Sequence, residues 1–283
     1  MLKNKKLELG LFSYSYHLAF GAHDVFTPKE TKKMDIFSFM DRVKELGFDG
    51  IQIDPMHLES YKEDYLNKVL NYAKNKGFYL EYGTTGVEEN HLFTQLEIAK
   101  KLESPILRTY IGFDPMGENV DPKKEVENAI LVLNKVKEKA AEYNIKIAIE
   151  NHCDLTTDEL VELVKEINSP YVGVCVDLGN FMIHLEDPVV SVKKLAPYIF
   201  STHFKDYAFS MENWGFKSFG VALGKGVIDL EAVLNILIED SKLDKIMLEL
   251  PVEKCLTEEA TLKKEDDIVV ESVKYAREVL GIK

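Results

Sequence analysis

Four short apolar runs of this 283-residue chain end in side chains that can bind a metal ion or move a proton. The runs are IKIAIE, VGVCVD, YIFSTHF and KIMLEL, and they carry Glu150, Asp177, His203 and Glu249 at or beside their ends. A carboxylate or imidazole is costly to bury in an apolar strand unless it is paired or coordinated. Three carboxylates and one imidazole, with no thiol, form an oxygen-rich donor set that suits Mn²⁺, Mg²⁺ or Co²⁺, and Zn²⁺ is also compatible. The alternative is a set of unrelated buried salt bridges and hydrogen bonds.

The elements that must position these side chains recur with a regular period. Eight short runs rich in β-branched or aromatic residues alternate with stretches that have apolar residues at helical spacing. Thr156–Glu159 predicts a helix N-cap, and Gly47 and Gly77 predict left-handed helix ends. Eight strand–helix units predict a parallel (β/α)8 TIM barrel, as a single domain over 1–283. The alternative is an open doubly wound sheet, but no G-x-G-x-x-G follows the first run. The runs lie at 7–16, 50–54, 78–83, 105–113, 145–150, 172–177, 198–204 and 245–250.

Strand alternation predicts which neighbours share a face with the candidate ligands. In such barrels the functional residues gather at the C-terminal strand ends, and residues two apart on a strand point the same way. His152 should therefore lie beside Glu150, and Lys205 beside His203. Asn151 should turn away and hold neighbouring backbone. His152 is either a general base or donor to a substrate oxygen, or a structural histidine.

Three further sequence features each have two possible interpretations. His17 ends the first run and either contacts substrate or belongs to a loop. Arg108 lies within the fourth run and needs an anionic partner, which is a substrate group or, as we favour, Asp54 or Glu81. The segment 215–226 is a lid or substrate loop, and its G-K-G at Gly224–Gly226 is alternatively a phosphate cradle.

Composition narrows the class of partner. The formal net charge is −13, from 35 basic and 48 acidic residues, which argues against a nucleic-acid partner. No segment approaches the ~20 apolar residues of a membrane helix. Cys153, Cys175 and Cys255 are odd in number and widely spaced, so we expect reduced thiols in a cytoplasmic protein. A homo-oligomer is compatible with the sequence.

Several motifs together resemble a known family. AIENH, VCVDLGN, STHFKD and LGKGVIDL followed by MLELP resemble the sugar phosphate isomerase/epimerase branch of the xylose isomerase-like TIM-barrel superfamily. That superfamily contains D-tagatose 3-epimerase, D-psicose epimerase, inosose dehydratase and endonuclease IV. The resemblance covers essentially the whole chain. It implies a small carbohydrate substrate, a divalent metal held by Glu150, Asp177, His203 and Glu249, and proton transfer by Glu150 and Glu249.

The expected chemistry is proton abstraction next to a carbonyl. A metal chelates two vicinal oxygens of a hydroxy-ketone and stabilises the enediolate that forms when a carboxylate removes a carbon proton. We expect an isomerase or epimerase of a small keto-sugar or polyol, with Mn²⁺ as the favoured metal. A lyase of the inosose-dehydratase or keto-glycoside-cleaving type is the alternative. An endonuclease-like phosphodiesterase is disfavoured, because it needs several more histidines at other strand ends.

The chain departs from the epimerase pattern at two places. Asn180 stands where those epimerases carry a histidine, and Lys205 and Asp206 follow the strand-seven histidine, where an arginine is expected a few residues on. We expect Asn180, Lys205, Arg108 and His17 to contact substrate, and His152 to join Glu150 and Glu249 in catalysis.

Overall fold

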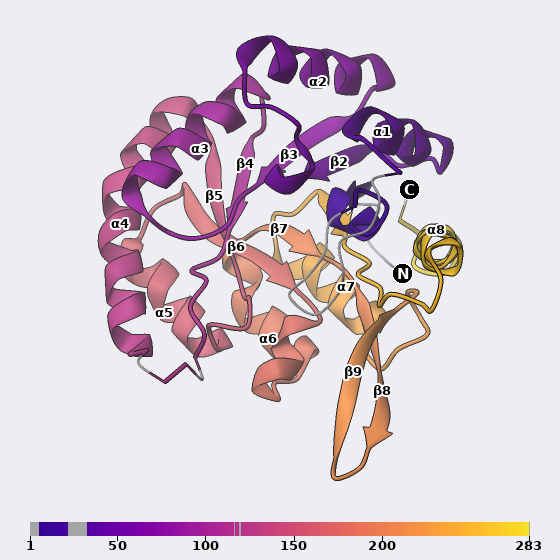
Figure 1. The fold of residues 1–283 in the computed structure, drawn as a ribbon. Coiled ribbons are helices and arrows are strands. Elements are labelled where there is room, and N and C mark those ends of the chain that lie inside the picture. Colours follow the sequence, from indigo (N-terminus) through magenta and orange to yellow (C-terminus); the bar gives the residue numbers. More distant parts are fainter. Residues whose placement is uncertain (1–5, 22–32, 116, 119, 283) are drawn as a thin grey trace.

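Eight parallel strands form the centre of the molecule, and helices surround them (Figure 1). The computed structural model describes residues 6–21, 33–115, 117–118 and 120–282. Strand β1 pairs with both β2 and β10, so the first and last strands of the barrel are neighbours. The predicted (β/α)8 barrel is therefore confirmed and the open sheet is excluded. The strands are β1 (Glu8–Phe12), β2 (Gly50–Ile53), β3 (Tyr79–Gly83), β4 (Ile106–Thr109), β5 (Lys146–Glu150), β6 (Val172–Asp177), β7 (Ile199–His203) and β10 (Lys245–Leu248).

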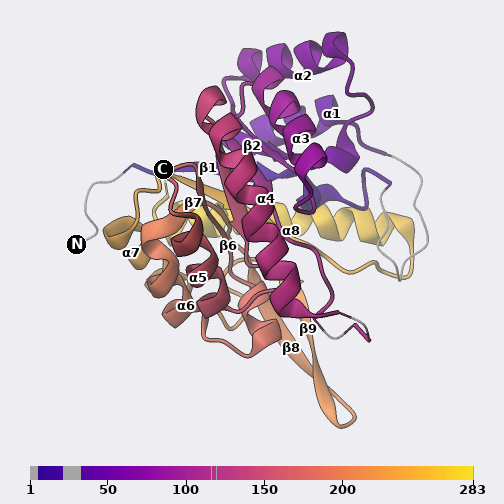
Figure 2. The same ribbon diagram turned by 90° about the vertical axis from the view of Figure 1, so that its left-hand side faces the viewer.

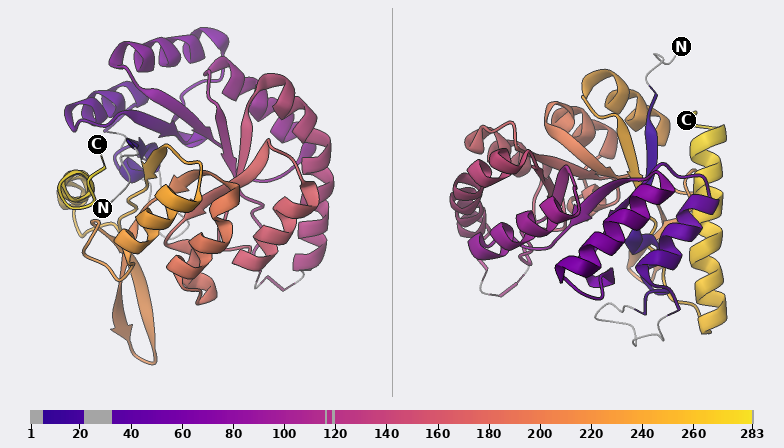
Figure 3. Two further views of the ribbon diagram at one scale, coloured as in Figure 1. Left: turned by 180° about the vertical axis from the view of Figure 1, so that it is seen from behind. Right: turned by 90° about the horizontal axis from the view of Figure 1, so that it is seen from above.

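The helices form an outer ring around the strands, with the yellow helix α8 running along one side (Figure 3). The predicted start of α5 is confirmed, because Thr156 and Glu159 form a reciprocal capping box. Gly47 and Gly77 have φ angles of 76° and 75°, as their predicted cap positions require. None of the described helices is long and apolar enough to cross a bilayer. The helices are α1 (Ile36–Glu45), α2 (Glu63–Lys76), α3 (Glu89–Lys101), α4 (Pro122–Tyr143), α5 (Thr157–Ile167), α6 (Pro188–Leu195), α7 (Leu230–Asp240) and α8 (Glu258–Glu278), with 3₁₀ turns η1 (Ser13–Tyr16), η2 (Pro55–His57), η3 (Asn180–His184) and η4 (Ala196–Tyr198).

The two faces of the strands have different characters. One set of alternate residues, such as Ile51, Ile147 and Ile149, is fully buried in the large apolar core that includes the helices. The other set supplies a smaller apolar cluster and many buried polar groups. Buried polar groups are costly unless they are paired. The interior of this barrel is therefore a network of polar contacts as well as a core. Its buried polar members on the strands include Gln52, Glu81, Arg108, Glu150, Asp177, Ser201 and His203.

The sparsest seam of the described barrel lies between β7 and β10. These strands form no regular ladder in the described sheet and meet at an isolated bridge between Phe204 and Leu248. The Phe204 N–H donates to the Met247 carbonyl over 2.8 Å, and the Met247 N–H donates to Thr202 Oγ1 over 3.0 Å. The candidate ligands His203 and Glu249 flank this seam.

An antiparallel hairpin stands away from the barrel after β7 (Figures 1 and 2). It consists of β8 (Asp206–Glu212) and β9 (Gly215–Val221). The prediction of a loop over 215–226 is wrong for 215–221, which is strand β9. The role of this segment as a lid or substrate contact stays a prediction. Most side chains of the hairpin are exposed or half-buried. Its sequence therefore lacks the alternation of buried and exposed residues by which a strand can be predicted.

Candidate active site

The four predicted ligands come together at the C-terminal mouth of the barrel. Glu150, Asp177 and His203 end β5, β6 and β7, and Glu249 follows β10 directly. The Nδ1 atom of His203 lies 3.3 Å from Glu150 Oε2, 3.1 Å from Glu249 Oε2 and 3.7 Å from Asp177 Oδ2. All four side chains are buried. Parallel strands bring their ends to one edge, and for this reason residues spread over 100 positions meet here.

The donor set fits a divalent cation. Within the described part of the chain, Glu150 Oε2, Asp177 Oδ2 and His203 Nδ1 are buried and have no hydrogen-bond partner of normal geometry, although Arg108 and Lys205 form ion pairs with the two carboxylates. Buried polar atoms are normally hydrogen-bonded, so atoms without such a bond that face one point mark a ligand site. The ligand atoms of Asp177, His203 and Glu249 lie within 4.8 Å of one another. Carboxylate oxygens and one imidazole nitrogen suit Mg²⁺, Mn²⁺, Co²⁺ or Zn²⁺.

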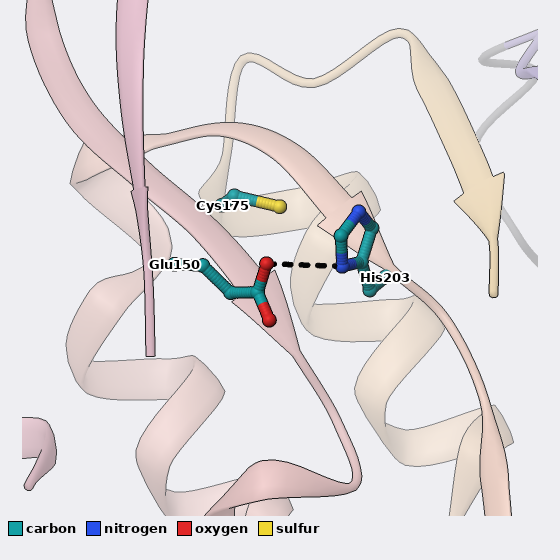
Figure 4. A group of neighbouring side chains, drawn as sticks. All are labelled: Glu150, Cys175 and His203. Carbon is teal, nitrogen blue, oxygen red and sulfur yellow. Dashed lines mark ion pairs between the residues drawn. The ribbon is translucent and has the colours of Figure 1, made fainter. Parts of the chain in front are cut away.

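A thiol lies next to this set, contrary to the sequence expectation. Cys175 belongs to β6, and its Sγ lies with ligand atoms of Glu150 and His203 in a second group that spans no more than 4.8 Å. Figure 4 shows the thiol on the same side as the Glu150 carboxylate and the His203 ring. Burial raises the pKa of Cys175 to about 12, so it is a neutral thiol at neutral pH.

Gln52 orients the His203 ring. The Nε2 atom of His203 lies 2.8 Å from Gln52 Oε1, and Gln52 Nε2 donates to Glu81 over 2.9 Å. Ser201 donates to the same Glu81 oxygen over 2.7 Å. Because the Gln52 amide is fixed by Glu81, Nε2 of the ring is the donor and Nδ1 faces the carboxylates. Sequence reasoning missed Gln52, although a polar residue in the apolar run GIQID was the available signal.

Arg108 has an internal partner, as favoured, but not either of the carboxylates named. Its Nε lies 3.1 Å from Glu150 Oε2, and it donates to the Thr84 carbonyl over 3.0 Å. Burial alone raises the pKa of Glu150, but the charges of Arg108 and His203 outweigh it and lower the pKa to about 2. The Glu81 carboxylate instead accepts hydrogen bonds from Gln52 and Ser201, and the Asp54 carboxylate accepts one from the Met56 N–H.

Lys205 and Asn180 contact the ligand carboxylates. The Lys205 ammonium lies 2.5 Å from Asp177 Oδ2 and also pairs with Glu249 Oε2. Although burial opposes the charge, Asp177 and Glu249 raise the pKa of Lys205 well above its usual value. Asn180 donates from Nδ2 to Glu150 Oε1 over 3.2 Å. The expectation for Asn151 is confirmed, because its amide exchanges two hydrogen bonds with the Asp177 backbone.

A cavity of about 340 Å³ opens above these groups and includes His152. The His152 ring stacks on Tyr110 with centroids 4.1 Å apart and planes 11° apart. His17 lies elsewhere. It stacks on Tyr14 and lines a neighbouring hollow of about 590 Å³ that shares Tyr14, Tyr207 and Pro251 with the first cavity. The first cavity is lined by Tyr14, Asp54, Met56, Thr85, Arg108, Tyr110, Glu150, His152, Asp177, Asn180, Lys205, Tyr207, Glu249 and Pro251.

The suggested phosphate cradle at Gly224–Gly226 is wrong. The Asp206 carboxylate already accepts from the backbone N–H groups of Gly224, Gly226 and Ile228 over 3.0, 2.8 and 3.2 Å. A Cβ on Gly226 would lie 2.1 Å from Asp206 Oδ1, so the loop needs glycine for this close approach. The loop thus anchors the end of β7 and, with it, the backbone of Lys205.

Comparison with known proteins assigns the family. Residues 40–279 match the family model of the xylose isomerase-like TIM barrel. This chain belongs to that family. The resemblance to the xylose isomerase-like family expected from the sequence is confirmed, and the TIM-barrel class with it.

Two curated relatives are named as enzymes. The chain is 30% identical over 203 residues to the 3-oxo-isoapionate decarboxylase of Pectobacterium atrosepticum, covering 71% of this chain and 72% of that protein. It is 27% identical over 190 residues to the 3-dehydroshikimate dehydratase of Bacillus anthracis, covering 60% and 67%.

Solved structures share the fold at lower identity. A D-psicose 3-epimerase crystallised with D-fructose has a TM-score of 0.71 and 19% identity, covering 97% of this chain and 100% of that one. The IOLI protein with a bound zinc atom also has a TM-score of 0.71, with 20% identity, covering 95% and 98%. At these identities the similarity establishes the fold alone.

Proposed function

We propose that this protein is a divalent-metal-dependent enzyme that abstracts a proton next to the carbonyl of a small keto-sugar or polyol-derived ketone. The observation that carries the proposal is the convergence of Glu150, Asp177, His203 and Glu249 beneath a cavity of about 340 Å³. A divalent ion held by these residues would supply positive charge to an enediolate. Mn²⁺ is our first choice, because three of the four ligands are oxygens; the zinc of the IOLI protein keeps Zn²⁺ as the alternative.

The two glutamates differ in how much of each carboxylate is available. Glu150 accepts from Asn180 on Oε1 and faces Arg108 with Oε2. Glu249 contacts Lys205 and His203 through Oε2, whereas its Oε1 accepts no hydrogen bond from the described residues. Glu249 is therefore the stronger candidate for the base that takes the carbon proton. Glu150 is the more rigidly held ligand, and a second proton carrier in an epimerase.

Isomerase or epimerase remains our first candidate class. An isomerase returns the proton to the adjacent carbon with one base, whereas an epimerase needs a second base on the opposite face. The asymmetry between Glu150 and Glu249 favours the one-base reaction. His152 on the cavity wall is a further candidate proton carrier, and Arg108, Asn180 and Lys205 are candidate substrate contacts. His17 would reach only a substrate that extends into the neighbouring hollow.

A carbon–oxygen or carbon–carbon lyase is the second candidate. Two curated relatives are named as a decarboxylase and a dehydratase. The Lys205 ammonium beside Glu249 also gives the site a charged donor that can hydrogen-bond to a leaving oxygen. We also propose that the protein acts on a small-molecule substrate in the cytoplasm.

The experiment is proton exchange in D₂O. Mn²⁺-loaded protein is incubated with keto-sugars, inososes, 3-keto-glycosides and 3-oxo sugar acids, and the products are followed by NMR. We expect deuterium at the carbon next to the carbonyl of one class. Relocation of the carbonyl would identify an isomerase, inversion at one carbon an epimerase, and loss of water, of a substituent or of CO₂ a lyase.

Glu249→Gln tests the base. The amide cannot take a proton, so exchange should fall by at least ~10²-fold, the lower range for general-base catalysis. The matched control is Glu253→Gln, an exposed carboxylate four positions on, which should retain full exchange. Wild-type exchange in Glu249→Gln, or exchange that is indifferent to EDTA, would contradict the mechanism.

A further inference from the structure

Exposed apolar side chains gather on the β8–β9 hairpin. Met211, Trp214 and Phe216 expose 84%, 102% and 60% of their surface. Figures 1 and 2 show the hairpin standing away from the barrel. Scattered apolar residues on a surface are ordinary, but a contiguous group of large ones marks an interaction site.

The strand register places Met211 and Phe216 on one face of the hairpin, together with Phe209. Met211 lies opposite Phe216, and Phe209 lies opposite Ser218. Phe209, Met211 and Phe216 therefore share a face of the hairpin. The Phe209 and Phe216 rings pack edge-on with centroids 5.2 Å apart. A two-stranded hairpin is marginally stable by itself, so an uncovered apolar face of this kind calls for a partner.

A hollow of about 340 Å³ lies at the base of the same face, lined in part by Leu185, Phe209, Phe216 and Val227. Carboxylates on its rim are already used within the chain. Asp187 accepts from the Val189 and Val190 N–H groups at the start of α6, and Asp229 accepts from the Ala232 N–H at the start of α7. Glu186 likewise accepts from the Thr157 backbone and hydroxyl. The hollow therefore suits an apolar occupant better than a cationic one.

Leu185 adds an independent observation. Its φ angle is +56°, in the left-handed region, while 81% of its surface is exposed. The other described non-glycine residues with positive φ are three asparagines and a glutamate. Asparagine fits this conformation better, and leucine gains nothing from exposure. A leucine at this position is explained if another surface covers it.

We propose that the occupant is a second copy of this chain, joined through the β8–β9 hairpins about a two-fold axis. One surface carries both a projecting apolar tip and an apolar hollow, so two copies related by a two-fold axis are complementary. A buried aromatic side chain removes roughly 150–250 Å² from water, so Trp214, Phe216 and Phe209 offer roughly 400 Å² at their present exposures. The exposed surface of Met211, Leu185 and Val227 raises the area that each copy can bury towards the ~800 Å² per partner of a standard interface.

Trp214 is the single tryptophan of the chain and reports directly on this contact. Light scattering coupled to size exclusion, and sedimentation, should give a dimer mass that falls to the monomer mass on dilution. Over the same range, tryptophan emission should shift from that of a buried indole to that of a water-exposed one. A monomer mass with water-exposed emission at every concentration would overturn the proposal and leave this face to a different protein.

Two variants locate the interface. Leu185→Asn should fold at least as well as the wild type, because asparagine tolerates the left-handed conformation, and should weaken the dimer at least tenfold. Trp214→Ser should do the same without touching the core. The control is Leu131→Gln, an equally apolar residue, 63% exposed, on α4 across the barrel, which should leave the dimer unchanged. A dimer that survives both Leu185→Asn and Trp214→Ser would place the contact elsewhere and refute the assignment. The dimer does not depend on the proposed enzyme activity.

Discussion

At the residue scale, Lys205 contacts the same carboxylate oxygens that we propose as metal ligands. Its ammonium contacts Asp177 Oδ2 and Glu249 Oε2, which are the oxygens of those residues that face His203 Nδ1. Arg108 similarly faces Glu150. Buried carboxylates repel one another unless cations lie between them. Lys205 therefore balances charge when no ion is bound, and an ion that binds must displace the ammonium from these oxygens.

Lys205→Met is thus expected to bind Mn²⁺ more tightly than the wild type. Removing a competing contact of about 1.4 kcal/mol would tighten binding about tenfold. Isothermal titration calorimetry at one fixed pH measures the affinity, and Lys225→Met, an exposed lysine on the following loop, is the control. Affinity equal to or weaker than wild type would show that the ammonium does not compete.

The candidate site was predictable from the sequence where a single strand carries the signal. Glu150, Asp177 and His203 end apolar runs, so alternation and barrel geometry sufficed to bring them together. The partners of these ligands were not predictable in this way. Gln52 on β2 reaches across the barrel to His203, 151 positions away, and Arg108 on β4 pairs with Glu150 at the end of the adjacent β5 rather than with Asp54 or Glu81. Such contacts depend on barrel closure and on side-chain length, which periodicity does not encode.

Among the elements, helix α8 holds the segment after β1 through a buried carboxylate. Glu265 accepts from the Leu18 and Ala19 N–H groups over 2.8 and 2.9 Å. Burial raises the pKa of Glu265 from 4.5 to about 7. The folded state therefore binds a proton more tightly than the unfolded chain does. Its contribution to stability is fully present below pH 4.5 and is lost as the pH rises through about 7.

Glu265→Gln should remove this pH dependence. The loss in the wild type amounts to about 3 kcal/mol, because one pKa unit corresponds to about 1.4 kcal/mol. Thermal unfolding between pH 4.5 and 8 should therefore show the wild type losing stability relative to Glu265→Gln as the pH rises. Glu271→Gln, an exposed carboxylate on the same helix, should track the wild type. A constant difference between wild type and Glu265→Gln would contradict the raised pKa.

Elements were predictable in proportion to what they bury. The eight barrel strands pack an apolar face against helices, and each lies within a predicted run. The β8–β9 hairpin was not predicted, because its apolar residues do not pack against the core and give no burial pattern. Gly215 and Gly220 therefore made the sequence of β9 resemble that of a loop. The Asp206 contacts with Gly224 and Gly226 were not predicted for a different reason. The backbone N–H groups of a glycine-rich loop can donate to a carboxylate of the same chain as readily as to a phosphate.

At the scale of the whole molecule, the candidate metal site bridges the weakest join of the barrel. Strands β7 and β10 meet at one isolated bridge, whereas β10 pairs with β1 in a regular ladder and β7 pairs with β6 in a ladder that has one register shift, between Val174 and Cys175. His203 and Glu249 stand on opposite sides of that join. An ion held by both adds its binding free energy to the folded state, because the unfolded chain has no such site. The gain should concentrate at the β7–β10 join.

Hydrogen exchange measured by mass spectrometry tests this coupling. With Mn²⁺ in excess, the Phe204 and Glu249 amides, which bond across the join, should exchange at least tenfold more slowly than after EDTA treatment. Peptides from β2 and β3 serve as the internal reference, since that pair has a complete ladder and supplies none of the four ligands. The midpoint of thermal unfolding should rise by several degrees, as expected when a ligand binds only the folded state. His203→Ala should abolish the slowing by removing a ligand on one side of the join. Equal slowing in β2 and β3, or slowing that persists in His203→Ala, would mean that the ion stabilises the barrel from another site.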